Sequence, residues 1–365
     1  MTLSAKRSRV IFLDLIRAFA VLMMVQGHTV DVLLSDYYRN LESFFYSAWQ
    51  FNRGMTAPLF LFTSGITFTY LFRLHKEPFS KNPRVRKGIK RALLLIFIGY
   101  LLRYPTSTIV IFDEVTPYQW QLFFSVDVLH LIGFGLLFLL LILYLAERTK
   151  QRDWVVFTAF ILINLSLHPF FENIDWTSFM HPAFAGYFYR KSGSNFPLFP
   201  WLSYIYAGGM LGSYLADHPE VFKSFKFTYR TFIIGLSLIL ISMSGTIFER
   251  VILGTDTFWT YSPMLTLLRF GIVMLIISAF VLTARKMETI PRIIILLGRN
   301  TLLIYAVHLI ILYGSPWNLG MAYIATHGFN LLNTFLTVIL MWSLMIVMVY
   351  LLNRFQIRNK PIDAA

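Results

Sequence analysis

Ionisable side chains that could carry chemistry lie in the first apolar stretch of the sequence, residues 10–31. They are Asp14, Arg17 and His28, with Asp31 closing the stretch. A charge inside a membrane-spanning helix costs roughly 2.5 to 3.5 kcal/mol, so such residues indicate a function. His28 suits general acid–base chemistry, because an imidazole titrates near neutral pH. Asp31 lies three residues further on and could hold the second ring nitrogen, fixing the tautomer of His28.

The spacing of Arg17 and His28 predicts that both side chains lie on one face of a helix. At about 100° per residue the interval between them comes to about 1100°, close to a whole number of turns. At about 1.5 Å per residue, the two would be separated by roughly 16 Å along the helix axis. We therefore expect a cation towards one end of this face and an imidazole towards the other.

The composition is that of a membrane protein, with 57% hydrophobic and only 14% charged residues among 365. We expect an all-α, polytopic integral membrane protein with about ten transmembrane helices, forming a single domain over residues 1–365. The ten stretches of spanning length are 10–30, 54–72, 88–104, 122–145, 154–168, 197–216, 229–247, 262–283, 293–313 and 331–352.

The formal net charge of +14 would suggest nucleic acid as the partner of a soluble protein. In a polytopic protein, positive charge instead marks the cytoplasmic loops. If the amino end lies in the cytoplasm, the loops on that side carry most of the Lys and Arg residues. We therefore predict that both ends are cytoplasmic, that His28 lies near the outer face, and that the protein binds no nucleic acid. The chain has no cysteine, and no metal site is predicted.

Five blocks of sequence resemble one protein family. The first, DLIRAFAVLMMVQGH, has an arginine, ten residues and then a histidine. The others follow in order: APLFLFTSGITF, FSVDVLHLIGFGLLFLL, FPLFPWLSYIYAGGMLG and GRNTLLIYAVHLIILY. Together they resemble the transmembrane acyltransferase superfamily and, within it, the bacterial relatives of the heparan-α-glucosaminide N-acetyltransferase catalytic domain family.

This resemblance implies an enzyme that moves an acyl group, usually acetyl, from cytoplasmic acyl-CoA to an amine or hydroxyl of a glycan on the outer side. It also implies that the histidine of the first helix is catalytic, which here is His28. The sugar enzyme of the family has its catalytic histidine in the loop after this helix, but no histidine separates His28 from His75. The absence of a large outer domain favours a bacterial inner membrane.

The resemblance also calls for cations that bind the phosphates of CoA. Arg17 faces the predicted cytoplasmic half and could contact the donor, or pair with Asp14. A basic cluster opens the third apolar stretch and could bind CoA, mark the cytoplasmic side, or contact anionic lipid. The basic cluster consists of Arg84, Arg86, Lys87, Lys90 and Arg91.

Three more ionisable residues lie in later apolar stretches. Asp127 could orient His28 or bind the acceptor, or it could pair with His130 for purely structural reasons. Arg269 and His308 could both line the cavity in which the acceptor binds and contact the acceptor there. Alternatively, they could make structural hydrogen bonds.

The sequence thus predicts an acetyl-CoA-dependent membrane acetyltransferase in which His28 is the general base and Asp31 or Asp127 orients it. Its partners would be acyl-CoA, a glycan or other polar acceptor and the lipid bilayer, with a homodimer left open. The alternative is a secondary transporter or exporter with a proton relay on the first helix, which explains the polar face but not the spacing of Arg17 and His28. A third possibility is a sensor or an assembly partner without catalytic activity, for which the helical architecture alone would be enough.

Overall fold

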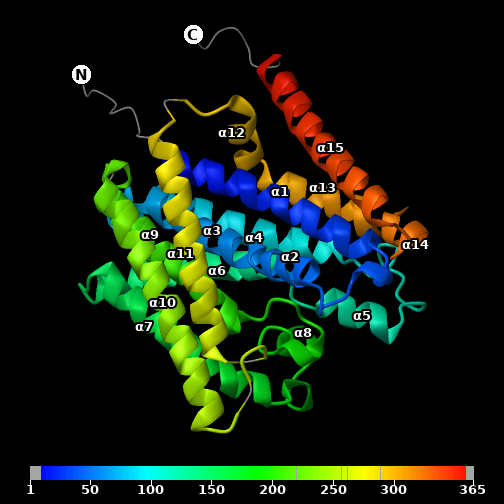
Figure 1. Cartoon of the computed structure of the whole chain (residues 1–365), viewed down its shortest axis with the longest axis horizontal. Coiled ribbons are helices and arrows are strands. Elements are labelled where there is room, and N and C mark those ends of the chain that lie inside the picture. Colours follow the sequence, from blue (N-terminus) through cyan, green and yellow to red (C-terminus); the bar gives the residue numbers. More distant parts are fainter. Residues whose placement is uncertain (1–9, 219, 256, 261, 288, 359–365) are drawn as a thin grey trace. The chain divides into compact units, whose positions relative to one another are not determined.

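The computed structural model of the chain is helical almost throughout (Figure 1), which confirms the all-α prediction. It describes residues 10–218, 220–255, 257–260, 262–287 and 289–358. The chain divides into two compact units, which we name the terminal unit, Val10–Thr56 with Lys286–Ala365, and the central unit, Ala57–Arg285. That both act as one acyltransferase domain over residues 1–365 stays a prediction.

The terminal unit is built around α1, which runs unbroken through the first apolar stretch and packs against α12, α13 and α15 (Figure 1). The indole Nε1 of Trp342 on α15 donates to the carbonyl of Leu22 on α1 at 2.8 Å. The elements of this unit are α1 (Ile11–Leu33), the 3₁₀ turn η1 (Asp36–Tyr38), α2 (Phe44–Gly54), α12 (Arg292–Arg299), α13 (Thr301–Tyr313), β1 (Gly314–Ser315), β2 (Asn318–Leu319), α14 (Met321–Ala325) and α15 (Leu331–Arg358).

The carboxyl-terminal end of α1 is closed by a single arginine. The last carbonyls of a helix lack partners within it. The guanidinium of Arg39 donates hydrogen bonds to three carbonyl oxygens at this end of α1, those of Leu34 at 2.9 Å, Val30 at 3.3 Å and Asp31. The backbone N–H of Phe329 donates to the Leu33 carbonyl as well, at 2.9 Å. The end of α1 that carries His28 is therefore fixed from two sides.

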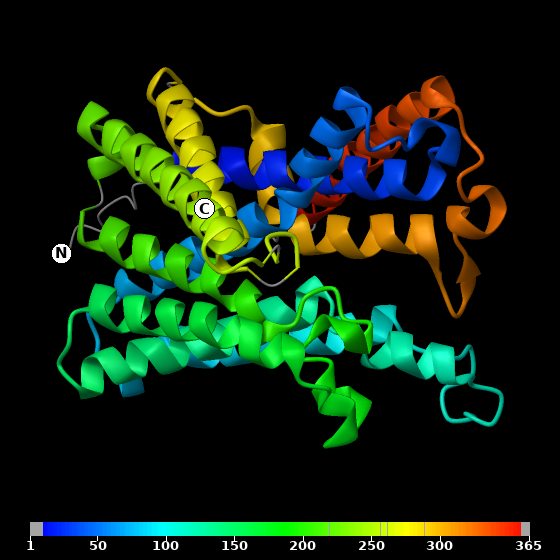
Figure 2. The same cartoon turned by 60° about the horizontal axis from the view of Figure 1, so that its bottom comes forward.

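The central unit contains the remaining helices. They are α3 (Thr56–Arg73), η2 (Phe79–Lys81), α4 (Pro83–Leu102), α5 (Pro117–Phe124), α6 (Val128–Arg148), α7 (Asp153–Asn173), η3 (Trp176–Ser178), α8 (Pro182–Ala185), η4 (Arg190–Ser192), α9 (Leu198–Asp217), η5 (Val221–Lys223), α10 (Phe225–Val251) and α11 (Pro263–Arg285). The most extensive packing is between α10 and α11, which lie side by side (Figure 2), followed by α4 on α6 and α7 on α9.

Glycines allow α3 and α9 to touch through their backbones. A Cβ at Gly208 would lie 2.0 Å from the carbonyl oxygen of Phe62, and one at Gly65 would lie 2.1 Å from that of Ile205. Close approach through small residues is a typical way to pack membrane helices, because lipid gives apolar side chains little reason to prefer one another. An ion pair joins the same region, with the guanidinium of Arg73 binding Asp153 at 2.5 and 2.7 Å.

The loop between α7 and α9 is held by one carboxylate. Asp175 accepts hydrogen bonds from the hydroxyls of Thr177 at 2.5 Å, Tyr189 at 2.7 Å and Ser178 at 3.0 Å. These bonds favour the charged form and hold the pKa of Asp175 at about 2. The carboxylate of Asp175 thus fixes the conformation of the loop that follows α7.

Each of the ten expected stretches falls on a helix or a helix pair. Among the described residues, seven helical stretches are long and apolar enough to cross a membrane. The pair α12 and α13, bent by 73°, would make an eighth if it forms one broken span. The other two expected stretches fall on α4 and α9, which do not meet that criterion. The protein is an integral membrane protein, whereas ten spans and cytoplasmic ends stay predictions. Residues 1–9 and 359–365, which carry part of the charge used for that orientation, lie outside the described residues.

Candidate active site

Two histidines and a tyrosine meet where α1 and α13 pack together. Nδ1 of His28 lies 3.0 Å from the hydroxyl of Tyr313. The ring centroids of His28 and His308 are 5.4 Å apart. His308 is fully buried, whereas His28 is half-buried. The two histidines that the sequence analysis treated separately are therefore neighbours, with one of them accessible.

The hydrogen bond of His308 fixes its tautomer. Its Nδ1 lies 2.7 Å from the carbonyl oxygen of Ile304 on the same helix. Because a carbonyl can only accept, Nδ1 of His308 carries the proton. In the neutral ring Nε2 is then the acceptor.

The tautomer of His28 depends on the direction of its bond with Tyr313, because a phenol can donate or accept. If Nδ1–H of His28 donates to the Tyr313 oxygen, Nε2 keeps a lone pair and can take a proton. The reverse direction puts the proton on Nε2 and removes the base from that position. A role for His28 as a general base through Nε2 thus requires Tyr313 to accept.

Asp31 is paired with Arg53 of α2 rather than with His28. Nη2 of Arg53 lies 2.7 Å from the Asp31 carboxylate, and each side chain is about one third exposed. The stem of Arg53 crosses α1 at Gly27, where a Cβ would lie 3.3 Å from Cγ of Arg53. The ring nitrogen that Asp31 was expected to hold lies beside the Tyr313 hydroxyl instead. A catalytic role for Asp31 stays a prediction.

Removing either member of the Asp31–Arg53 pair should destabilise the terminal unit. We expect Asp31→Asn and Arg53→Met each to lower the free energy of unfolding by about 1 to 2 kcal/mol, because a partly buried partner loses its counter-charge. The double variant should lose less than the sum, leaving a coupling of about 0.5 kcal/mol or more. Thermal unfolding of all four proteins in one detergent measures this, and purely additive losses would contradict it.

Arg17 lies on α1 at the crossing with α12 and is half-buried. A Cβ at Gly298 of α12 would lie 3.6 Å from Cβ of Arg17 and 3.1 Å from the Asp14 carbonyl oxygen. Because α1 is continuous from Ile11 to Leu33, the expected separation of Arg17 and His28, roughly 16 Å along the axis, applies to this helix.

Asp127, in the central unit, is the N-cap of α6. Its carboxylate accepts from the backbone N–H of His130, and its own N–H donates to Nδ1 of His130 at 3.1 Å, which together make a capping box. The carboxylate also accepts from the N–H of Val128 at 2.6 Å. Nε of Arg103 lies 3.4 Å from the same carboxylate. The structure therefore contains the predicted contact between Asp127 and His130. It also contains an ion pair between Asp127 and Arg103, which the sequence did not suggest.

Arg269, also in the central unit, lies over the ring of Trp201, with 5.6 Å between its Cζ and the ring centroid. This is a cation–π contact. It holds the guanidinium close to an aromatic surface of α9.

The basic cluster lies in the first turns of α4, where Asn82 caps the helix by accepting from the N–H of Arg84 at 2.9 Å. All of its members are exposed except Arg84, which is half-buried. Cations are disfavoured near a helix amino terminus by the helix dipole. A cluster of them in this position therefore favours an anionic partner.

No group of three or more His, Cys, Asp or Glu side chains in the described part of the chain could hold a metal ion. We assign no metal ligand.

A family model matches more than half of the chain. It describes the heparan-alpha-glucosaminide N-acetyltransferase catalytic domain and matches residues 9–246, from just before α1 to within α10. His28 lies within the matched range, whereas His308 and Tyr313 lie beyond it. No curated protein gives a significant match.

Proposed function

Because the chain belongs to the heparan-alpha-glucosaminide N-acetyltransferase catalytic domain family, we propose that it transfers acetyl from cytoplasmic acetyl-CoA to an amine or hydroxyl of a glycan on the outer side. The observation that carries this proposal is the half-buried His28 held by Tyr313 beside His308. Membership favours group transfer over transport of a solute. We further propose a bacterial inner membrane as its location.

In the proposed reaction the acceptor nitrogen or oxygen attacks the thioester carbonyl of acetyl-CoA. Nε2 of His28 takes the proton that the acceptor loses, and Tyr313 accepts the hydrogen bond from Nδ1–H. The carbon–sulfur bond then breaks and CoA leaves as a thiolate, which takes the proton back from Nε2 of His28 and restores the neutral imidazole. The products are an acetylated acceptor and free CoA.

The other predicted residues take supporting roles in this proposal. Arg17 and the basic cluster would attract the phosphates of CoA. His308, beside His28, would contact the acceptor, and Asp31 would position α2 through Arg53. That Arg269 contacts the acceptor, and that Asp127 orients the base or the acceptor, stay predictions. Either member of a dimer would carry the His28 site complete, since its three side chains come from one chain.

A direct test uses purified protein in detergent with [¹⁴C]acetyl-CoA and glucosamine-terminated oligosaccharides. We expect free CoA and labelled oligosaccharide to appear in equal amounts. Labelled acetate without labelled acceptor would indicate thioester hydrolysis. Neither product, with a protein shown to be folded, would contradict the proposal for this class of acceptor.

The hydroxyl of Tyr313 should matter for turnover rather than for binding. We expect Tyr313→Phe to lower kcat by about 3- to 10-fold, since one such hydrogen bond contributes about 0.5 to 1.5 kcal/mol, with the KM for acetyl-CoA unchanged. Steady-state kinetics measure both constants. Tyr323→Phe, which removes an exposed hydroxyl from α14, is the matched control. An equal loss in both variants would rule out a specific contact with His28.

A further inference from the structure

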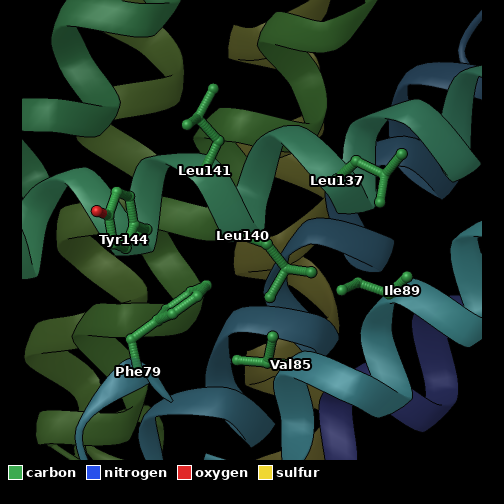
Figure 3. Close-up of a pocket in the computed structure, with 7 residues that line it drawn as sticks. All are labelled: Phe79, Val85, Ile89, Leu137, Leu140, Leu141 and Tyr144. Atoms are coloured by element: carbon green, nitrogen blue, oxygen red, sulfur yellow. The ribbon is translucent and has the colours of Figure 1, made fainter.

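A shallow apolar groove lies between α4 and α6 in the central unit (Figure 3). Its volume is about 280 Å³. Ile89, Leu141 and Tyr144 on its walls are 39%, 42% and 44% exposed, so it opens outwards. The hydroxyl of Tyr144 is the only polar side-chain atom among the lining residues, which are Phe79, Val85, Ile89, Leu137, Leu140, Leu141 and Tyr144.

Two members of the basic cluster stand beside this groove. Arg86 follows Val85 and Lys90 follows Ile89, so each lies about 100° further round α4 than a lining residue. Both are exposed. Neither makes an ion pair within the described part of the chain. The groove thus has two cations at its edge that are available to an anion.

The same face of α4 becomes apolar further along the helix. Leu93 and Phe97 continue the face of Arg86 and Lys90 and are 57% and 62% exposed. The face therefore presents positive charge for two turns and hydrocarbon for the next two. A phospholipid has the matching sequence of groups, a phosphate followed by an acyl chain.

We propose that the groove between α4 and α6 binds an acyl chain of an anionic phospholipid, whose phosphate is held by Arg86 and Lys90. An acyl chain fits the lining because it needs no hydrogen-bond partner there. A peptide segment or the amide-containing arm of CoA would leave polar groups unpaired against these side chains.

This inference goes beyond acetyl transfer and divides the basic cluster by helix face. Arg84, Lys87 and Arg91 recur at intervals of three and four residues, so they form a stripe of their own. Arg86 and Lys90 form the other stripe. Arg84, Lys87 and Arg91 keep the proposed role of binding the CoA donor. Arg86 and Lys90 are assigned to the phosphate of the phospholipid.

The test measures the affinity of the whole purified protein for dioleoylphosphatidylglycerol in a neutral detergent by native mass spectrometry. We expect one tight site for this lipid and none for dioleoylphosphatidylcholine. The variant Arg86→Gln/Lys90→Gln should bind about 25-fold more weakly, since each basic residue contributes about 5-fold. Ile89→Trp or Leu141→Trp, which fill the groove from α4 and from α6, should abolish tight binding.

Matched variants on α10 serve as controls. Lys226→Gln/Arg230→Gln removes two exposed cations from the first turns of α10, which is a candidate membrane-spanning helix, and Leu240→Trp adds bulk at an exposed position there. Both should keep the tight site. An equal loss in the α10 double variant would mean diffuse charge attraction and overturn the proposal. Displacement of the lipid by stoichiometric CoA would assign this face to the donor and overturn it as well.

Discussion

Replacing His28 with Ala should lower the rate of acetyl transfer by about 10²- to 10⁴-fold, the usual contribution of a positioned general base. The acceptor must lose a proton as it attacks the thioester, and the half-buried imidazole of His28 is held in place by Tyr313 at 3.0 Å. The measurement is kcat for CoA release with labelled acetyl-CoA. The affinity for acetyl-CoA should stay close to that of the wild type.

Two variants separate loss of the base from loss of structure. His28→Gln keeps a polar side chain that can hydrogen-bond to Tyr313 but cannot act as a base, so it should be as inactive as His28→Ala. His218→Ala removes an exposed histidine from the end of α9 and should be fully active. A folded His28→Gln protein with wild-type kcat would rule out general-base catalysis by His28.

Replacing Gly208 with Ala should prevent the central unit from folding stably. The added Cβ would lie 2.0 Å from the carbonyl oxygen of Phe62, far inside contact distance. The obstacle is backbone, so it cannot move aside as a flexible side chain would. We expect a loss of about 3 kcal/mol or more, which is a large part of a typical stability. Yield, gel-filtration profile and thermal unfolding in detergent report it.

Gly328→Ala is the matched control for Gly208→Ala. Its Cβ would meet nothing closer than 3.5 Å, so the yield and unfolding temperature should equal those of the wild type. If Gly208→Ala unfolded at the same temperature as Gly328→Ala, close packing of α3 on α9 would not be what stabilises this unit.

The helices were predictable because their apolar stretches are long and continuous. The first stretch became α1 with nearly the predicted bounds. Long stretches of this kind can form only helices in a membrane, where every backbone group needs a partner. The bend between α12 and α13 was not predicted, although Gly298, Arg299 and Asn300 interrupt the stretch 293–313 at that point.

The partners in the site were less predictable, because they come from elements distant in sequence. Tyr313 is 285 residues from His28, and no periodicity connects them. Arg53 pairs with Asp31 from a different helix, so no spacing in the sequence suggested this ion pair. By contrast, the contact of Asp127 with His130 is local, so the spacing of three residues was enough to suggest it.

Transfer across the membrane is the central claim, and sealed vesicles test it most directly. The protein is reconstituted with a glucosamine-terminated oligosaccharide trapped inside, and [¹⁴C]acetyl-CoA is added outside. We predict labelled oligosaccharide within intact vesicles and free CoA outside, with neither product from His28→Ala vesicles. Label that reaches the oligosaccharide only after the vesicles are opened with detergent would contradict transfer from one face to the other.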